Sequence, residues 1–320
     1  MENRRDELDR FKSEINLGEY ACAVHGFVFD QRQSSRRSAV VRHSNGDKLV
    51  ITRRPNRHFV YFNAKGDASD SGSILDFIQA RRNVSLGKIR QELRAWSVVD
   101  ANSSAISTPI VLEPSLHDAS RVLRSWVKTA AVSAGNRYLL DARRIPSSTI
   151  VDPVFDGQIR TDARNNVLFA HRTLDGDLCG FEIKNSSFTG FSPGGNKSLF
   201  RSKSAADATT AILCETGIDL LSVAAIFGTQ QKQFFSTAGQ VSASQVTCVV
   251  QSLQAISNLK AVWLAFDNDA AGIKLAHQFK NELSKELPSV DVLLKLPEQD
   301  GFDWNDQLRQ SSPPAAKPSP

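Results

Sequence analysis

The sequence predicts an α/β protein in which a parallel sheet domain follows a mixed α+β subdomain and a small, ribbon-like, β-rich N-terminal module. Apolar strand-like runs alternate with helical patterns over residues 207–310, which is typical of consecutive βα units. Those runs lack turn-forming residues, as expected for buried strands. Short segments of alternating polarity near residues 39–42, 48–52 and 58–62 predict an antiparallel sheet at the front of the chain.

The composition is that of a water-soluble globular protein. With 320 residues, of which 41% are hydrophobic, the chain has room for two or three domains. No apolar run approaches the roughly 20 residues that a membrane-spanning helix needs, and the first residues are charged rather than signal-like. We therefore expect a cytoplasmic protein with no membrane partner. The four cysteines show no CxxC spacing and are expected to be reduced.

The first module, residues 1–99, opens with a charged helix over residues 1–17 and continues with the alternating strands. The net charge of +5 arises in the first 100 residues, and between residues 32 and 57 only Asp47 opposes a series of basic side chains. Such a patch beside an aromatic strand predicts contact with nucleic acid, whereas a solvated strand face is the alternative. The candidate contact residues are Arg36, Arg37, Arg42, Arg53, Arg54, Arg57 and Tyr61.

Small polar residues without periodicity predict a linker over residues 100–115. Two short helices and several short strands then predict a mixed α+β subdomain over residues 116–206. The parallel-sheet domain follows at residues 207–310. The proline-rich residues 311–320 have nothing to bury and are expected to be disordered.

Carboxylates follow two of the predicted parallel strands. Glu215 comes directly after the apolar run that ends at Cys214, and Asp267 and Asp269 follow the run that begins at Ala261. Because parallel sheets collect their chemistry at the carboxyl ends of the strands, these side chains are expected to meet. Converging carboxylates repel one another unless a cation lies between them, and hard oxygen ligands suit Mg²⁺ or Mn²⁺. Each acid alone is also a common helix N-terminal residue.

These elements resemble the Toprim domain, which bacterial primases, topoisomerases, small nucleases and recombination proteins share. The resemblance covers about residues 207–310 and rests on three acidic elements in the family's order. It implies that Glu215, Asp267 and Asp269 are catalytic. It also implies a metal site formed by Glu215, Asp219, Asp267, Asp269 and Asp303. The family's last acidic pair is Asp303-Trp-Asn305 here, so its second member is an amide.

The preceding segments resemble the front of bacterial replicative primases. Residues 1–99 follow the order of their zinc-ribbon module, but only Cys22 and His25 have ligand-like spacing, and we expect no zinc. Residues 116–206 resemble the subdomain that precedes Toprim in those enzymes. That resemblance implies that Lys184 and Lys197 bind the phosphates of a nucleotide or template; solvent-facing lysines are the alternative.

The resemblance implies a DNA-dependent primase or primase-like nucleotidyltransferase, similar to Toprim proteins of plasmids and other mobile elements. Its expected partners are single-stranded DNA, ribonucleoside triphosphates and a replicative helicase, and its expected cofactor is Mg²⁺ or Mn²⁺. Two alternatives remain open at this point. One is a Toprim nuclease that uses the same metal, and the other is a catalytically inactive nucleic-acid-binding accessory protein.

Overall fold

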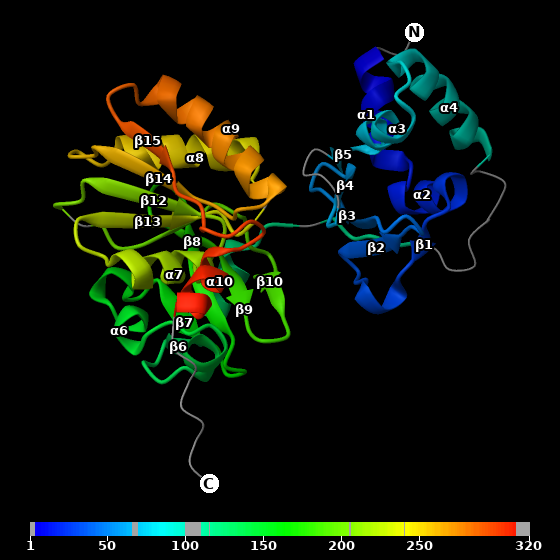
Figure 1. The fold of residues 1–320 in the computed structure, drawn as a ribbon. Coiled ribbons are helices and arrows are strands. Elements are labelled where there is room, and N and C mark those ends of the chain that lie inside the picture. Colours follow the sequence, from blue (N-terminus) through cyan, green and yellow to red (C-terminus); the bar gives the residue numbers. More distant parts are fainter. Residues whose placement is uncertain are drawn as a thin grey trace. The chain divides into compact units, whose positions relative to one another are not determined.

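The computed structural model describes residues 4–65, 70–99, 110–114, 116–204, 206–239 and 241–311. The chain divides into two compact units, Met1–Leu116 and His117–Pro320 (Figure 1). Most of the expected linker, residues 100–109 and 115, lies outside the described residues, as does the expected tail from residue 312 onward. None of the helices in the described ranges has the length and apolar character that crossing a membrane requires.

The N-terminal unit combines helices with an antiparallel sheet. Its helices are α1 (Arg4–Glu14), α2 (Leu17–His25), η1 (Gln31–Gln33), α3 (Ile74–Arg82) and α4 (Leu86–Val99). Its five strands pair in sequence order and are β1 (Val28–Phe29), β2 (Ser38–Arg42), β3 (Lys48–Arg53), β4 (Phe59–Asn63) and β5 (Ser71–Gly72). The unit is more helical than the sequence predicted.

Local capping explains why two helices replace the single charged helix expected at the start of the chain. The Asn16 side chain accepts hydrogen bonds from the backbone N–H groups of Gly18 and Glu19, so a new helix begins at Leu17. That helix ends at Gly26, whose φ of 69° is a left-handed conformation that glycine adopts without strain. The helices and the sheet enclose one apolar core.

The C-terminal unit is built on a ten-stranded sheet with an antiparallel and a parallel half. The path runs β10-β9-β8-β11-β13-β12-β14-β15, and β7 joins β6 to β8 at one side. The antiparallel half contains β6 (Ala130–Ala131), β7 (Ile159–Thr161), β8 (Val167–Arg172), β9 (Leu178–Lys184), β10 (Thr189–Phe191) and β11 (Leu199–Arg201). The parallel half contains β12 (Thr210–Cys214), β13 (Lys232–Ser236), β14 (Ala261–Ala265) and β15 (Asp291–Leu294).

Helices cover both faces of the parallel strands (Figure 1). Helices α7 (Gly217–Phe227) and α10 (Trp304–Ser311) pack in one apolar cluster, and α8 (Ala243–Gln254) and α9 (Ala270–Glu286) pack in another. The remaining helices are α5 (Ala119–Trp126), η2 (Tyr138–Ala142), α6 (Ser147–Ile150) and η3 (Pro153–Phe155). The expected α/β fold is confirmed.

The strand order determines where the acidic residues lie. Strands β12 and β14 are parallel neighbours, and Cys214 pairs with Ala265 at their ends. The segments after these two residues therefore leave the sheet at the same edge. The antiparallel strand β11 continues the same sheet through β13, so residues 116–206 and 207–310 share one sheet rather than forming separate layers.

Candidate functional site

The first acidic segment is the turn between β12 and α7. Thr216 caps α7 by accepting the Asp219 N–H at its Oγ1, and its hydroxyl donates to Asp219 Oδ2 at 2.6 Å. Gly217 lies against the ring of Phe169, and a Cβ at this position would stand only 2.4 Å from a ring carbon. A glycine is therefore required where the turn leaves the sheet, and this turn places Glu215 at the sheet edge and Asp219 in the buried first turn of α7.

The second acidic segment is the turn between β14 and α9. Asp269 caps α9, because its Oδ1 accepts the N–H of Gly272 at 2.7 Å. Gly272 in turn packs against the backbone of Asp267, where an added Cβ would come within 2.3 Å of the Asp267 carbonyl oxygen. Asp267 itself is only partly exposed, and its Oδ1 is buried with no hydrogen-bond partner among the described residues.

Asn268 fixes a third segment against this turn. Its backbone N–H donates to Phe302 O at 2.9 Å, its carbonyl accepts the Gly301 N–H, and its side-chain amide donates to Pro297 O at 3.0 Å. These bonds hold the loop that carries Asp303 beside the end of β14. Asn268 was not among the predicted site residues, although its position between two aspartates was a signal.

The acidic side chains at these strand ends influence one another electrostatically. Burial raises the pKa of Asp267 well above its usual range, and Asp219, Glu215 and Asp303 raise it further by repulsion. Burial, followed by repulsion from Asp303, raises the pKa of Asp219. Burial and Asp269 likewise raise the pKa of Glu215. Negative charge therefore accumulates here at a cost that a cation would relieve.

A buried ion pair borders the acids from the antiparallel half of the sheet. Glu182 and Lys184 lie on the same face of β9, with Lys184 Nζ 3.0 Å from Glu182 Oε1. The other oxygen, Glu182 Oε2, accepts the N–H of Gly217 at 3.1 Å, at the start of α7. Lys184 is thus buried rather than solvent-facing, and its attraction offsets a small part of the rise in the pKa values of Glu215 and Asp219. Glu182 was missed, although its i,i+2 spacing to Lys184 was visible in the sequence.

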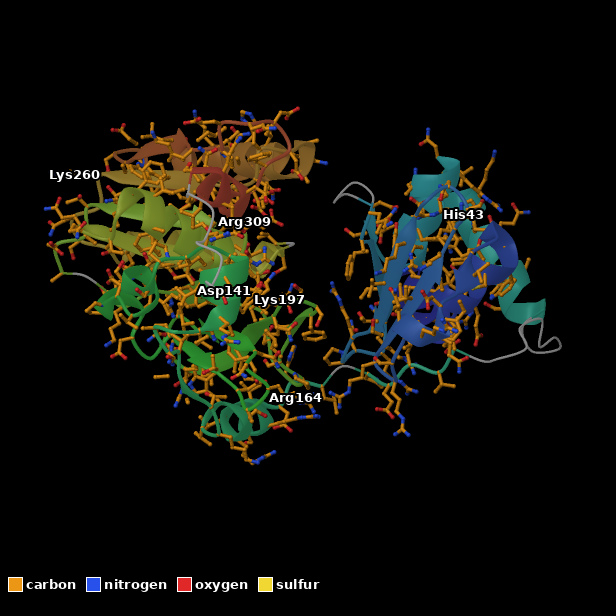
Figure 2. The ribbon with its side chains drawn as sticks, turned by 60° about the horizontal axis from the view of Figure 1, so that its bottom comes forward. His43, Asp141, Arg164, Lys197, Lys260 and Arg309 are labelled. Carbon is orange, nitrogen blue, oxygen red and sulfur yellow. The ribbon has the colours of Figure 1, made fainter. Side chains whose placement is uncertain are left out.

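Lys197 lies in the loop before β11 (Figure 2). Lys197 is an exposed residue, but its ammonium donates to Ala238 O at 2.8 Å and lies 6.0 Å from the centre of the Phe191 ring. Partial desolvation lowers the pKa of this ammonium, while Glu182 and Glu215 attract it. Lys184 and Lys197 therefore both interact electrostatically with the acidic residues.

Asn305 has a structural position. It is 1% exposed, its amide donates to Arg143 O at 2.8 Å and to Ser222 Oγ at 3.0 Å, and its Oδ1 accepts from the Arg143 guanidinium. These bonds tie α10 to α7 and to the segment after η2. The amide therefore stands where the resembled family has an acid because this position holds two helices together.

The acidic side chains are of the kind that binds a hard cation, but in the described residues they do not form a complete coordination shell. In the part of the chain that the structure describes, no three His, Cys, Asp or Glu side chains are gathered into a ligand shell. Carboxylate oxygens are the ligands that Mg²⁺ and Mn²⁺ prefer, and the unpartnered Asp267 Oδ1 is available to one.

The predicted nucleic-acid contacts have different surroundings. Arg36, Arg54 and Arg57 are exposed and Arg37 is half-buried, whereas Arg42 pairs with Asp30 at 2.8 Å. Arg53 lies 4.8 Å above the Phe59 ring.

The assignment of Tyr61 to base stacking was wrong. Tyr61 is 3% exposed, its hydroxyl donates to Asp70 Oδ1 at 2.6 Å, and its ring packs against Phe77. The alternation of β4 turns this ring inward, toward the helices, so neither face is open to a base.

Two family models match the chain. Residues 137–208 match a family described as "Protein of unknown function (DUF3991)", and residues 212–308 match a family described as "Toprim-like". The expected Toprim-type domain is therefore confirmed. No curated protein sequence is detectably similar to the chain.

Solved primase structures show a distant likeness. The primase fragment of the bacteriophage T7 primase-helicase protein has a TM-score of 0.38 and 19% identity, over 55% of this chain and 72% of that chain. The Aquifex aeolicus primase, with its zinc-binding and RNA polymerase domains, has a TM-score of 0.34 and 12% identity, over 95% and 82% respectively. At such scores the likeness adds no argument to the family match.

Proposed function

We propose that this chain, in which residues 212–308 form a Toprim-like domain, is a metal-dependent nucleotidyltransferase that makes RNA primers on single-stranded DNA. The observation that carries the proposal is the buried Asp267 Oδ1, which has no hydrogen-bond partner among the described residues although Glu215, Asp219 and Asp303 repel the same carboxylate. A protein gains nothing from such repulsion unless a cation relieves it. The resemblance to primases supplies the substrate class.

The residues that would hold Mg²⁺ or Mn²⁺ are Glu215, Asp267 and Asp269 at the strand ends, with Asp219 and Asp303 completing the acidic surroundings. A divalent ion at such a site would stabilise negative charge on the transferring phosphoryl group and lower the pKa of a bound hydroxyl. Asn305 is not part of this set, because both ends of its amide are engaged with Arg143 and Ser222.

The side chains of the site have separable tasks. Glu215, whose pKa is raised, is suited to take the proton from an attacking ribose hydroxyl at its carboxylate. Lys184, held by Glu182, and Lys197, held by Ala238 O, would neutralise the phosphates of an incoming ribonucleoside triphosphate. The exposed arginines of the N-terminal unit, Arg36 and Arg57 among them, would contact the backbone of the template strand.

Incorporation of labelled ribonucleotides on single-stranded DNA with Mg²⁺ tests this function. We expect the wild-type protein to extend primers and Asp267→Ala to lose activity by at least about a hundredfold. Asp300→Ala is the matched control, because Asp300 is an exposed acid in the loop pinned by Asn268 and lies outside the site. The control should retain activity.

The same assay separates the alternatives. Cleavage of the strand in the absence of nucleoside triphosphates, lost in Asp267→Ala, would favour a Toprim nuclease. Binding of single-stranded DNA that is equal in wild type and Asp267→Ala, without any turnover, would favour an inactive accessory protein.

A further inference from the structure

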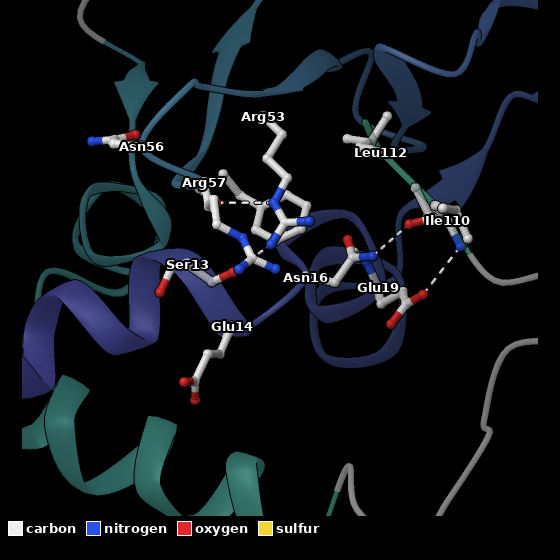
Figure 3. Close-up of a pocket in the computed structure, with 11 residues that line it drawn as sticks. Ser13, Glu14, Asn16, Glu19, Arg53, Asn56, Arg57, Ile110 and Leu112 are labelled. Atoms are coloured by element: carbon white, nitrogen blue, oxygen red, sulfur yellow. Dashed lines mark hydrogen bonds between the residues drawn. The ribbon is translucent and has the colours of Figure 1, made fainter. Parts of the chain in front are cut away.

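The N-terminal unit contains a pocket of about 600 Å³ that the acidic site does not explain (Figure 3). It lies between the end of α1, the turn from β3 to β4, and the segment at residues 110–112. Its lining includes Ser13, Asn16, Arg53, Asn56, Arg57 and Val111. This volume is within the range of small-molecule sites in proteins.

Arg53 is built into the wall of this pocket. Its Nε donates to Arg57 O at 3.0 Å, one terminal nitrogen donates to Ser13 O at 3.1 Å, and its guanidinium lies 4.8 Å from the centre of the Phe59 ring. Backbone carbonyls and an aromatic face thus fix its orientation without neutralising its charge. The remaining N–H groups of the fork stay available to a ligand.

Arg57 brings a second, unneutralised guanidinium to the same place. Figure 3 shows the Arg53 and Arg57 side chains directed toward one another. Burial lowers the pKa of Arg53, and repulsion from Arg57 lowers it further. Among the described residues neither guanidinium lies within ion-pair distance of a carboxylate, although several other arginines of this unit are paired in this way.

The two acids in the lining do not neutralise these arginines. Glu14 lies 3.9 Å from Arg10, and Glu19 accepts the N–H of Ile110 at 3.1 Å. The pocket therefore holds two adjacent positive charges that lack a counter-anion. Planar guanidinium groups in this arrangement suit a phosphate, and the exposed Val111 offers apolar surface to a sugar or base.

We infer that this pocket binds a phosphate ester of a nucleotide, with Arg53 and Arg57 on the phosphate oxygens. The phosphate comes from a single-stranded DNA backbone or from a free nucleoside triphosphate. The inference deepens the proposed template contact by assigning it to one pocket, and it does not depend on turnover at the acidic site.

The test measures binding of a fluorescent oligothymidylate to the full chain, with unlabelled ATP as competitor. We expect Arg57→Gln to weaken binding by about tenfold, since a charged hydrogen bond is lost. Arg53→Gln should weaken it at least as much, but this change also removes bonds within the fold. The Arg57 side chain has no partner among the described residues, so Arg57→Gln decides the test, and circular dichroism verifies folding.

The matched control is Arg32→Gln, which removes the same charge from an exposed residue of the same unit outside the pocket. It should lower affinity by no more than about twofold, as a distant charge would. Equal losses in Arg32→Gln and Arg57→Gln would overturn the inference, because the binding would then reflect net charge alone. So would undiminished binding in Arg57→Gln.

Competition identifies the source of the phosphate. Displacement of the oligonucleotide by ATP, lost in Arg57→Gln, would assign the pocket to free nucleotides, whereas binding of the strand that ATP does not displace would assign it to the DNA backbone. Asp267→Ala should bind like wild type in either case. A loss of primer synthesis with oligonucleotide binding intact would therefore indicate a defect at the acidic site. A loss of oligonucleotide binding with primer synthesis intact would indicate a defect at the pocket.

Discussion

Lys184 Nζ lies 3.0 Å from Glu182 Oε1 on one face of β9, beside the parallel strands whose ends carry the acids. The pair links the two halves of the sheet, since Glu182 also accepts the N–H of Gly217 at the start of α7. The buried Glu182 carboxylate contacts both the Lys184 ammonium and the N-terminus of α7. It therefore holds the ammonium in one place, without screening by solvent. The position of Lys184 is thus set before any nucleotide arrives.

Glu182→Gln should impair nucleotide binding more than turnover. The amide can still accept the Gly217 N–H, but the charge that orients Lys184 is lost. We expect KM for ribonucleoside triphosphates to rise by about tenfold while kcat changes less, because the proposed role of Lys184 is to bind phosphate. Steady-state incorporation kinetics measure both constants. Glu298→Gln, an exposed acid, is the control, and equal effects on kcat and KM would contradict the positioning role.

Asn305→Asp should destabilise the protein without adding a metal ligand. The new carboxylate would face the carbonyl oxygen of Arg143 at a position that is 1% exposed, although the Arg143 guanidinium offsets part of the repulsion. We expect a loss of about 2 kcal/mol in the free energy of unfolding, measured by urea denaturation. Gln310→Glu makes the same chemical change on the exposed side of α10 and should be neutral. An increase in Mg²⁺ affinity in Asn305→Asp would contradict the structural role.

The metal-free protein should lose stability as the pH rises. Because the folded state raises the pKa of Asp267, it holds a proton that the unfolded chain releases near pH 4. Stability from this group is therefore complete below about pH 4 and declines at higher pH until the folded-state pKa is passed. In EDTA, the Tm should fall between about pH 5 and pH 8.

The variant Asp267→Asn removes this ionisation. It should raise the metal-free Tm at about pH 8 by a few degrees, since roughly 1 kcal/mol corresponds to a few degrees in a domain of this size. Asp300→Asn should leave the Tm unchanged. Mg²⁺ should stabilise the wild type and not Asp267→Asn; equal stabilisation of both would show that the ion binds elsewhere.

Tyr61→Phe should affect stability and not DNA binding. The change removes a hydrogen bond of 2.6 Å to Asp70, which is also paired with Arg81 at 2.9 Å. We expect a loss of about 1 to 2 kcal/mol by urea denaturation and an affinity for single-stranded DNA within about twofold of wild type. A large loss of affinity in a fully folded variant would restore the stacking role.

The placement of the acidic residues at strand ends could be predicted because such ends can be recognised from apolar runs and turn residues alone. Glu215 and Asp267 could be placed at one sheet edge once β12 and β14 were expected to be parallel. Glu182 could not be assigned in the same way, because its contact with Gly217 depends on how the antiparallel strands join the parallel ones.

Packing determines the roles of residues that sequence patterns leave undefined. Tyr61 belongs to an alternating strand, and periodicity alone does not tell which face meets the helices. Asn305 replaces an acid of the resembled family, and only the contact of α10 with α7 reveals its partners. The helix α2 was not anticipated because an asparagine cap and a terminal glycine outweigh the strand-like character of the residues that precede β1.

The central claim is that acids from separate strands hold one divalent cation, and Mn²⁺ binding measured by electron paramagnetic resonance tests it most directly. At about pH 8 the wild type should bind Mn²⁺, Mg²⁺ should compete, and Glu215→Ala and Asp267→Ala should each weaken binding by at least about tenfold. Asp300→Ala should bind as the wild type does. Equal Mn²⁺ affinity in all four proteins, or none in the wild type, would contradict the claim.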